Sequence, residues 1–219
     1  MKDKGRRKLQ SIYNYYQPDF YHFSRNSVEL AKAVAEDWQN IRINFLKNEE
    51  VDIADFFSGS GVVVFEFFSR IFQSAEEDIL PQKWRVDGIE VQNEYHSIWK
   101  SNSHLLDSLV VNRQVAWNFI HRDIFSSSLK KYHLILANPP FYSEERALAS
   151  ENPQKNLCHF MSEKKLKNLP HLFYSQLVDN GVFYFLAHPS SLEFFWKKEI
   201  ASGKLKVFKE LRDAIILKG

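Results

Sequence analysis

The sequence predicts an α/β domain in which helices cover both faces of a doubly wound, seven-stranded and mostly parallel sheet. From residue 51 onward, short apolar segments alternate with longer segments of helical periodicity, the pattern of strand–helix–strand units. The last two strand-like segments, 205–211 and 214–218, are joined by Arg212-Asp213, which is too short for a crossover and predicts an antiparallel hairpin. A chain of 219 residues with 44% hydrophobic content is long enough for one such domain.

The elements follow in a regular order along the chain. Cap-forming residues at 24–27 precede apolar positions at helical spacing, which predicts a first helix over 27–40. Further helices are expected over 62–72, 92–109, 163–179 and 190–201, a polar loop over 142–162, and strands over 51–57, 85–90, 114–119, 134–137, 182–186, 205–211 and 214–218. We therefore expect one compact unit made of an N-terminal extension and helix, residues 1–48, and a sheet-forming domain, residues 49–219.

The composition excludes several classes of protein. Cys158 is the only cysteine, which excludes a disulfide within the chain and a zinc site built on cysteines. Eight histidines are scattered without ligand spacing, so no metal site is expected. No run of eighteen apolar residues and no signal peptide are apparent, so we expect no membrane span and a reducing, cytoplasmic location.

The N-terminus carries an uneven charge and many aromatic rings. The net charge of the chain is only +2, but the first eight positions hold five basic residues and a single acid. The basic residues are Lys2, Lys4, Arg6, Arg7 and Lys8. Such an arm suits either binding to phosphates or a solvated terminus. The following stretch, 12–23, holds four tyrosines and two phenylalanines, which suit base stacking or packing over a pocket.

The apolar run Leu134-Ile135-Leu136-Ala137 stops abruptly at Asn138-Pro139-Pro140-Phe141. Two prolines cannot donate hydrogen bonds to a sheet, so the strand must end there. An amide side chain, a free carbonyl and an aromatic ring are then left at the carboxyl edge, where ligands bind in open α/β sheets. The alternative is a strand followed by an ordinary proline-rich turn.

Three further features fall at the ends of predicted strands. Asp55 precedes the turn Ser58-Gly59-Ser60-Gly61, whose glycines allow a ligand to approach the backbone. Glu90 ends the second strand, where an acid can accept both hydroxyls of a ribose. Asp123, followed by the apolar Ile124, can accept a hydrogen from an adenine amino group. Each acid alone suits a helix cap or surface position, but together they predict a site for a nucleoside-containing cofactor.

This order of motifs resembles the class I S-adenosylmethionine-dependent methyltransferases, in the branch that methylates amino groups. The resemblance covers residues 50–219. Upstream, Tyr16-Gln17-Pro18 and the segment 21–31 resemble the bacterial valine tRNA adenine methyltransferases, as does the segment from Asn152 to Leu172. The resemblance implies a Rossmann-like fold, S-adenosylmethionine as cofactor, and RNA, most plausibly tRNA, as partner through the basic arm and the aromatic stretch.

The resemblance also implies roles for individual residues. The implied cofactor-binding residues are Asp55, Phe57, Ser58, Gly59, Gly61, Glu90, Asp123, Ile124 and Asn138, and the implied catalytic residues are Asn138, Pro139, Pro140 and Phe141. The Asn138 side-chain oxygen and the Pro139 carbonyl would accept the two hydrogens of the target amine, while Phe141 would stack on the base. The chain departs from the family at Phe57, where glycine is usual, and at Asn26, where an acid is usual.

Methylation of the 6-amino group of an adenine in RNA is therefore the expected function. Four alternatives stay open: methylation of a glutamine amide on a release factor, of a guanine in ribosomal RNA, of adenine in DNA, or RNA binding without catalysis on a methyltransferase scaffold. Only about fifty residues precede the first strand, which disfavours the release-factor enzymes and leaves no room for a separate DNA-recognition domain.

Overall fold

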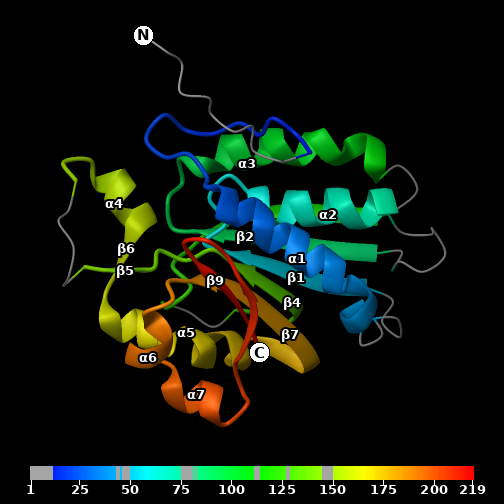
Figure 1. Ribbon diagram of the computed structural model, residues 1–219. Helices are drawn as coiled ribbons and strands as arrows, with labels where there is room; N and C mark the ends of the chain where they lie inside the picture. Colours follow the sequence, from blue (N-terminus) through cyan, green and yellow to red (C-terminus); the bar gives the residue numbers. More distant parts are fainter. Residues whose placement is uncertain are drawn as a thin grey trace, which may run out of the picture.

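The computed structural model describes residues 12–42, 45, 50–74, 81, 83–110, 114–126, 129–144 and 150–219, and the predicted basic arm lies outside these residues. Within them, seven strands form one sheet in the order β3-β2-β1-β4-β7-β9-β8 (Figure 1). The strands are β1 (Glu50–Phe56), β2 (Lys83–Glu90), β3 (Gln114–His121), β4 (Tyr132–Ala137), β7 (Leu177–Ala187), β8 (Lys206–Glu210) and β9 (Ile215–Lys218). The pairs from β3 to β7 are parallel, whereas β9 is antiparallel to both β7 and β8. The predicted fold class is confirmed.

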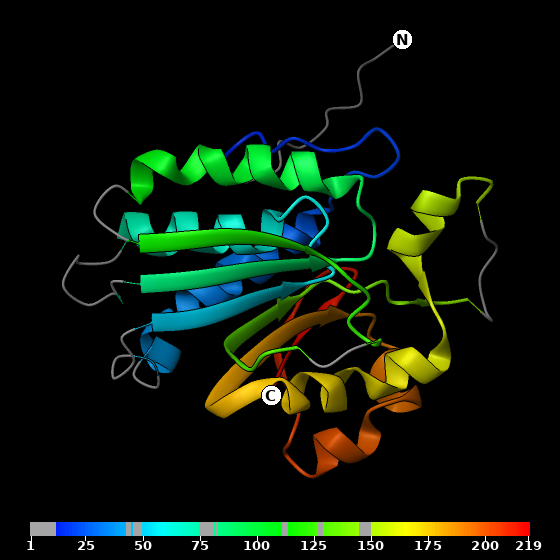
Figure 2. The same ribbon diagram turned by 180° about the vertical axis from the view of Figure 1, so that it is seen from behind.

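Helices cover both faces of the sheet, which gives three layers (Figures 1 and 2). One face carries α1 (Arg25–Ile41), α2 (Val62–Ser74), α3 (Tyr95–Ser103) and a short 3-10 helix, His104–Leu109; the other carries α5 (Glu163–Ser175), α6 (Ser191–Phe194) and α7 (Lys197–Ala201). Each face has its own apolar core. Trp38, Phe67 and Trp84 pack together in the first core, so α1 shares a core with the sheet. The division of the chain at residue 48 stays a prediction.

Three predicted helices end or break earlier than expected. The helix expected over 92–109 is α-helical only over Tyr95–Ser103 and continues as a 3-10 helix over His104–Leu109. The helix expected over 163–179 stops at Ser175, because residues from Leu177 onward pair with β4 as the first part of β7. The helix expected over 190–201 is split into α6 and α7 at Trp196. The Trp196 ring is almost fully buried and packs on Phe185 of β7, so the break brings a large apolar side chain into the core.

The predicted loop over 142–162 contains regular structure. A small parallel sheet pairs β5 (Tyr142–Ser143) with β6 (Phe160–Met161), and α4 (Pro153–His159) lies between them in the chain. The Asn152 side chain accepts a hydrogen bond from the Lys155 amide, 3.2 Å away, and caps this helix. Pro153 stands at the first helical position, which proline favours. Sequence periodicity misses such a short helix because it has too few turns to show a pattern.

The aromatic stretch packs along α2 and α3. The Tyr15 hydroxyl donates to Glu66 at 3.0 Å, and the Tyr15 ring is buried. The Tyr16 amide donates to the Asn102 side chain at 2.8 Å, and Asn102 in turn donates to the carbonyl of Ser60 in the turn after β1. The structure therefore shows packing for this part of the stretch, and base stacking by its rings stays a prediction.

A buried polar cluster fastens α1 to the sheet. The Asp37 carboxylate accepts hydrogen bonds from Asn40 at 2.7 Å and from the Tyr184 hydroxyl of β7, and it pairs with Lys218 of β9 at 2.6 Å. Burial by itself raises the pKa of Asp37, but the hydrogen bonds from Asn40, Lys218 and Tyr184 outweigh burial and lower the pKa below its usual value.

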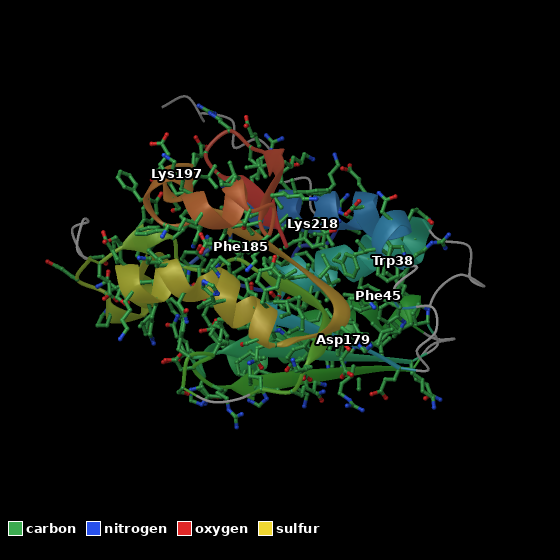
Figure 3. All side chains as sticks on the ribbon, turned by 90° about the horizontal axis from the view of Figure 1, so that it is seen from below. Trp38, Phe45, Asp179, Phe185, Lys197 and Lys218 are labelled. Carbon is green, nitrogen blue, oxygen red and sulfur yellow. The ribbon has the colours of Figure 1, made fainter. Side chains whose placement is uncertain are left out.

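Replacing Asp37 by asparagine is expected to lower the free energy of unfolding by about 3 kcal/mol at neutral pH, because it breaks a largely buried ion pair. An acid whose pKa is lowered by folding stabilises the protein above its unfolded pKa of about 3.9, and this contribution is lost as the pH falls through the folded pKa. Urea unfolding should therefore show a large difference between the Asp37→Asn variant and the wild type at neutral pH, and this difference should shrink as the pH falls below about 4. Asp179→Asn, at an exposed position of β7, is the control (Figure 3). A difference independent of pH would contradict the assignment.

Candidate active site

A cavity of about 300 Å³ opens at the carboxyl edge of β1, β2 and β4. Phe56 is paired with Ile89 of β2 and with Ala137 of β4, so the next residues of these strands, Phe57, Glu90 and Asn138, stand at the same edge. All three line the cavity. The volume is within the range of small-molecule sites, and the position is the one that ligands take in doubly wound sheets.

The turn after β1 forms one wall of the cavity and has an unusual backbone. Phe57, Gly59 and Gly61 have φ angles of 59°, 49° and 77°, in the left-handed region. The Gly61 amide donates to the Ser58 carbonyl at 2.7 Å, which closes the turn, and α2 begins directly afterwards. Phe57, Ser58, Gly59 and Ser60 line the cavity, whereas Gly61 lies behind them.

Phe57 stands where glycine is usual in the family that the sequence resembles, and its ring has a structural role. A left-handed residue costs about 1–2 kcal/mol for any side chain other than glycine. Here the Phe57 ring lies 6.4 Å from the Phe125 ring, and both rings line the cavity. The strained residue therefore contributes an apolar wall that glycine would not provide.

Asp55 lies beneath this turn and does not line the cavity. Its side chain is fully buried, and neither carboxylate oxygen has a hydrogen-bond partner within the described residues. Burial raises the pKa of Asp55 well above its usual range, and the Glu90 carboxylate raises it further; the nearby Val64 amide opposes the shift without reaching hydrogen-bond geometry. Asp55 therefore lies close to the site without being exposed to a ligand in the cavity.

Glu90 connects the turn after β1 with the turn after β2. Its carboxylate accepts hydrogen bonds from the Gly59 and Gln92 amides, each at 3.0 Å, and its side chain is 7% exposed in the cavity wall. Burial raises the pKa of Glu90, while the amides of Gln92, Gly59 and Val91 partly offset the rise. A carboxylate has about four acceptor positions, so two of them are available for donors in the cavity.

Asp123 and Ile124 line the cavity on the side of β3. The Asp123 carboxylate accepts the Phe125 amide at 3.0 Å and pairs with Lys165 of α5 at 3.2 Å. Ile124 is almost fully buried, and the Lys165 ammonium lies 4.8 Å from the centre of the Phe125 ring. This corner of the cavity therefore combines a carboxylate with flat apolar walls.

The four residues after β4 are divided between the cavity and the core. Asn138 and Pro140 line the cavity, whereas Pro139 and Phe141 do not. The partly buried Phe141 packs against the first core and lies 5.3 Å from the Tyr142 ring. The Asn138 side chain donates through Nδ2 to the Ser27 hydroxyl at 3.0 Å, which leaves Oδ1 as the atom that accepts. The catalytic roles implied by the sequence stay predictions.

The structure adds cavity residues that the sequence did not single out. Gln92 is one of them: its Oε1 is buried without a hydrogen-bond partner among the described residues, as is Oγ of the predicted Ser58, and both residues line the cavity. Tyr95 of α3 is buried and also lines the cavity beside Cys158, with its hydroxyl 3.4 Å from the sulfur. Cys158 belongs to α4. The only sequence signal for this helix was that the segment from Asn152 to Leu172 resembles the tRNA adenine methyltransferases.

Two kinds of site are not found in the part of the chain that the structure describes. No group of three or more His, Cys, Asp or Glu side chains gathers in a way that would hold a metal ion. None of the helices described is long and apolar enough to cross a membrane.

Solved structures share this architecture. The hMettl16 catalytic domain, in complex with the MAT2A 3′UTR hairpin 1, aligns with 97% of this chain and 75% of its own at a TM-score of 0.60 and 13% identity. Ribosomal protein L11 methylase from Lactobacillus delbrueckii subsp. bulgaricus aligns over 93% and 88% (TM-score 0.50, 16% identity). Magnesium protoporphyrin IX methyltransferase (ChlM) from Synechocystis PCC 6803, with bound SAM, aligns over 91% and 86% (TM-score 0.51, 11% identity). The chain has the fold of these methyltransferases. No protein-family profile and no curated protein sequence matches it.

Proposed function

We propose that the protein binds S-adenosylmethionine and transfers its methyl group to the exocyclic 6-amino group of an adenine in RNA, with tRNA as the first candidate. The observation that carries the proposal is the meeting of Asn138, Glu90 and the turn 57–61 in one cavity. A turn and an acid suited to a nucleoside stand beside an amide suited to an amine. The fold shared with solved methyltransferases supports the same activity.

The cavity fits the cofactor in its polar groups. The Ser58 hydroxyl, which has no partner among the described residues, can donate to the carboxylate of the cofactor's amino-acid end, whereas Asp55 is buried beneath the turn and does not line the cavity. Glu90 retains acceptor positions for the ribose hydroxyls, and Asp123, with Ile124 and the Phe57 and Phe125 rings, suits the adenine. The cofactor supplies an electrophilic methyl group bonded to a sulfonium sulfur.

The residues of the chain would act on the amine that receives the methyl group. An exocyclic amino nitrogen is a weak nucleophile because its lone pair is delocalised into the ring. Asn138 Oδ1 can accept one of its hydrogens from the cavity wall, and the resemblance implies the Pro139 carbonyl, which is not part of the cavity lining, as the acceptor of the other. Two such hydrogen bonds would favour a tetrahedral nitrogen whose lone pair can attack the methyl group. Direct displacement then depends chiefly on proximity and orientation. As the N–C bond forms, the bond between the methyl group and sulfur would break and the thioether product would leave. The nitrogen is then cationic and acidic and would give its proton to water, so no side chain with an unusually low pKa is required.

A group of aromatic and imidazole rings beside the cavity favours a nucleobase as the acceptor. Tyr142, directly after the tetrapeptide, is 45% exposed and lies within ring-contact distance of His159, Phe160 and His188. Tyr21 lines the cavity and lies 5.3 Å from the His159 ring. Exposed rings of this kind stack on unpaired bases. The target adenine would therefore be single-stranded or flipped out of its helix.

The test is to incubate the protein with methyl-labelled S-adenosylmethionine and, separately, with tRNA, ribosomal RNA and release factor, and then to identify the labelled residue. We expect label in 6-methyladenine of an RNA. Label in glutamine would refute the RNA substrate, and label in guanine would refute adenine. Binding of RNA without binding of S-adenosylmethionine would refute the enzymatic function altogether.

A further inference from the structure

Ser27 is the one side chain of α1 that lines the cavity. It lies in the first turn of that helix, is 2% exposed, and accepts the 3.0 Å hydrogen bond from Asn138 Nδ2. The two residues are 111 positions apart in the sequence. The helix of the predicted N-terminal unit, residues 1–48, therefore reaches the amide at the centre of the proposed reaction.

We propose that Ser27 is a positioning residue that holds the Asn138 carboxamide with Oδ1 toward the acceptor amine. The proposal rests on the proposed function and concerns the same site. The two ends of a carboxamide have nearly the same shape, but one donates hydrogen bonds and the other accepts them. An amide turned by half a rotation would present N–H groups to the N–H groups of the substrate. The bond to Ser27 engages Nδ2 and so favours the productive orientation.

The surroundings of Ser27 make it suitable for this role. The neighbouring Val28 and Ala31 are buried in the first core, so the first turn of α1 is fixed by packing. Farther along the helix, Asp37 is bound to Tyr184 and Lys218 of the sheet. The amide of Ser27 donates to the Ser24 carbonyl at 3.2 Å, which closes the turn. A hydroxyl held on such a rigid element restricts the rotation of its partner side chain.

Ser24 provides a matched control in the same turn. It is the N-cap of α1, but its side chain makes no capping hydrogen bond and is exposed. Ser24→Ala therefore changes the same chemical group within the same helix start without touching Asn138. Any effect of Ser27→Ala that merely reflects the composition of the helix terminus should also appear in Ser24→Ala.

The experiment compares methyl transfer by the wild type, Ser24→Ala, Ser27→Ala, Asn138→Ala and the double variant Ser27→Ala/Asn138→Ala. We expect Ser27→Ala to lower kcat about ten-fold, with KM for S-adenosylmethionine and the melting temperature close to those of the wild type. Ser24→Ala should keep the wild-type kcat. In the Asn138→Ala background, removal of the Ser27 hydroxyl should have no further effect, because a positioning residue acts only through its partner.

A spectroscopic readout separates this inference from the proposed function. In protein labelled at asparagine nitrogen, the side-chain NH₂ resonance of Asn138, identified by its loss in Asn138→Ala, should shift in Ser27→Ala and not in Ser24→Ala. An unshifted resonance, or additive effects in the double variant, would overturn the role of Ser27 even if the enzyme is active. If the wild type transfers no methyl group to any substrate, the proposed function fails. The resonance of Asn138 still tests the hydrogen bond in that case, and an unshifted resonance in Ser27→Ala still overturns the role of Ser27.

Discussion

Asn138→Ala is expected to lower kcat for methyl transfer by roughly 10²–10³-fold, the range found when one preorganised hydrogen-bonding group is removed from an active site. The variant loses the side-chain oxygen that would accept a hydrogen of the target amine, and it loses the link to Ser27 at 3.0 Å. Affinity for S-adenosylmethionine should change little, because the turn 57–61 and Glu90 are untouched. Single-turnover methylation and cofactor titration measure the two effects separately.

Two further variants sharpen this prediction. Asn138→Asp keeps acceptor oxygens but loses the Nδ2 donor, so its kcat is expected to lie between those of the wild type and Asn138→Ala. Asn168→Ala removes an exposed asparagine of α5 and should have no effect on kcat. Full methyl transfer by Asn138→Ala with normal cofactor binding would show that the amide does not take part in the reaction.

The parts of the site that the sequence predicts are those set by strand ends. An apolar run followed by two prolines has few structural solutions, and parallel strands that alternate with helices bring their carboxyl ends to one edge. Asn138, Glu90 and the turn after β1 therefore meet as expected. The left-handed backbone at Gly59 and Gly61 is likewise predictable, because glycine adopts positive φ at low cost.

Side-chain pairing across the fold is the part that sequence does not predict. Ser27 meets Asn138, and Lys165 meets Asp123, because α1 and α5 pack at particular heights against the sheet. The sequence around either partner does not specify where along the sheet these helices pack. The same holds for Phe141, which could face either the cavity or the core from the same backbone and packs against the core. Long-range packing decides such positions, whereas periodicity reports only local preference.

Gly61→Ala is expected to lower the free energy of unfolding by about 3 kcal/mol. Two costs combine. The φ angle of 77° penalises any Cβ by about 1–2 kcal/mol. In addition, a Cβ here would overlap the Phe65 ring and come within 2.8 Å of Trp99 Nε1. Both rings are buried and pack on each other at 4.8 Å, so neither has free space to move into.

Gly203→Ala separates the two costs. Gly203 has a similar φ of 72°, but nothing lies within 4 Å of a Cβ placed there, so this variant should lose only about 1 kcal/mol. Urea unfolding of both variants measures the difference, which is the steric cost of crowding Phe65 and Trp99. Gly61→Ala should also weaken cofactor binding, since any shift of α2 to relieve the overlap moves the turn that carries Ser58 and Gly59. Equal losses of stability in the two variants would contradict the steric cost. They would mean that Phe65 and Trp99 move without penalty and that only the backbone torsion disfavours a side chain at Gly61.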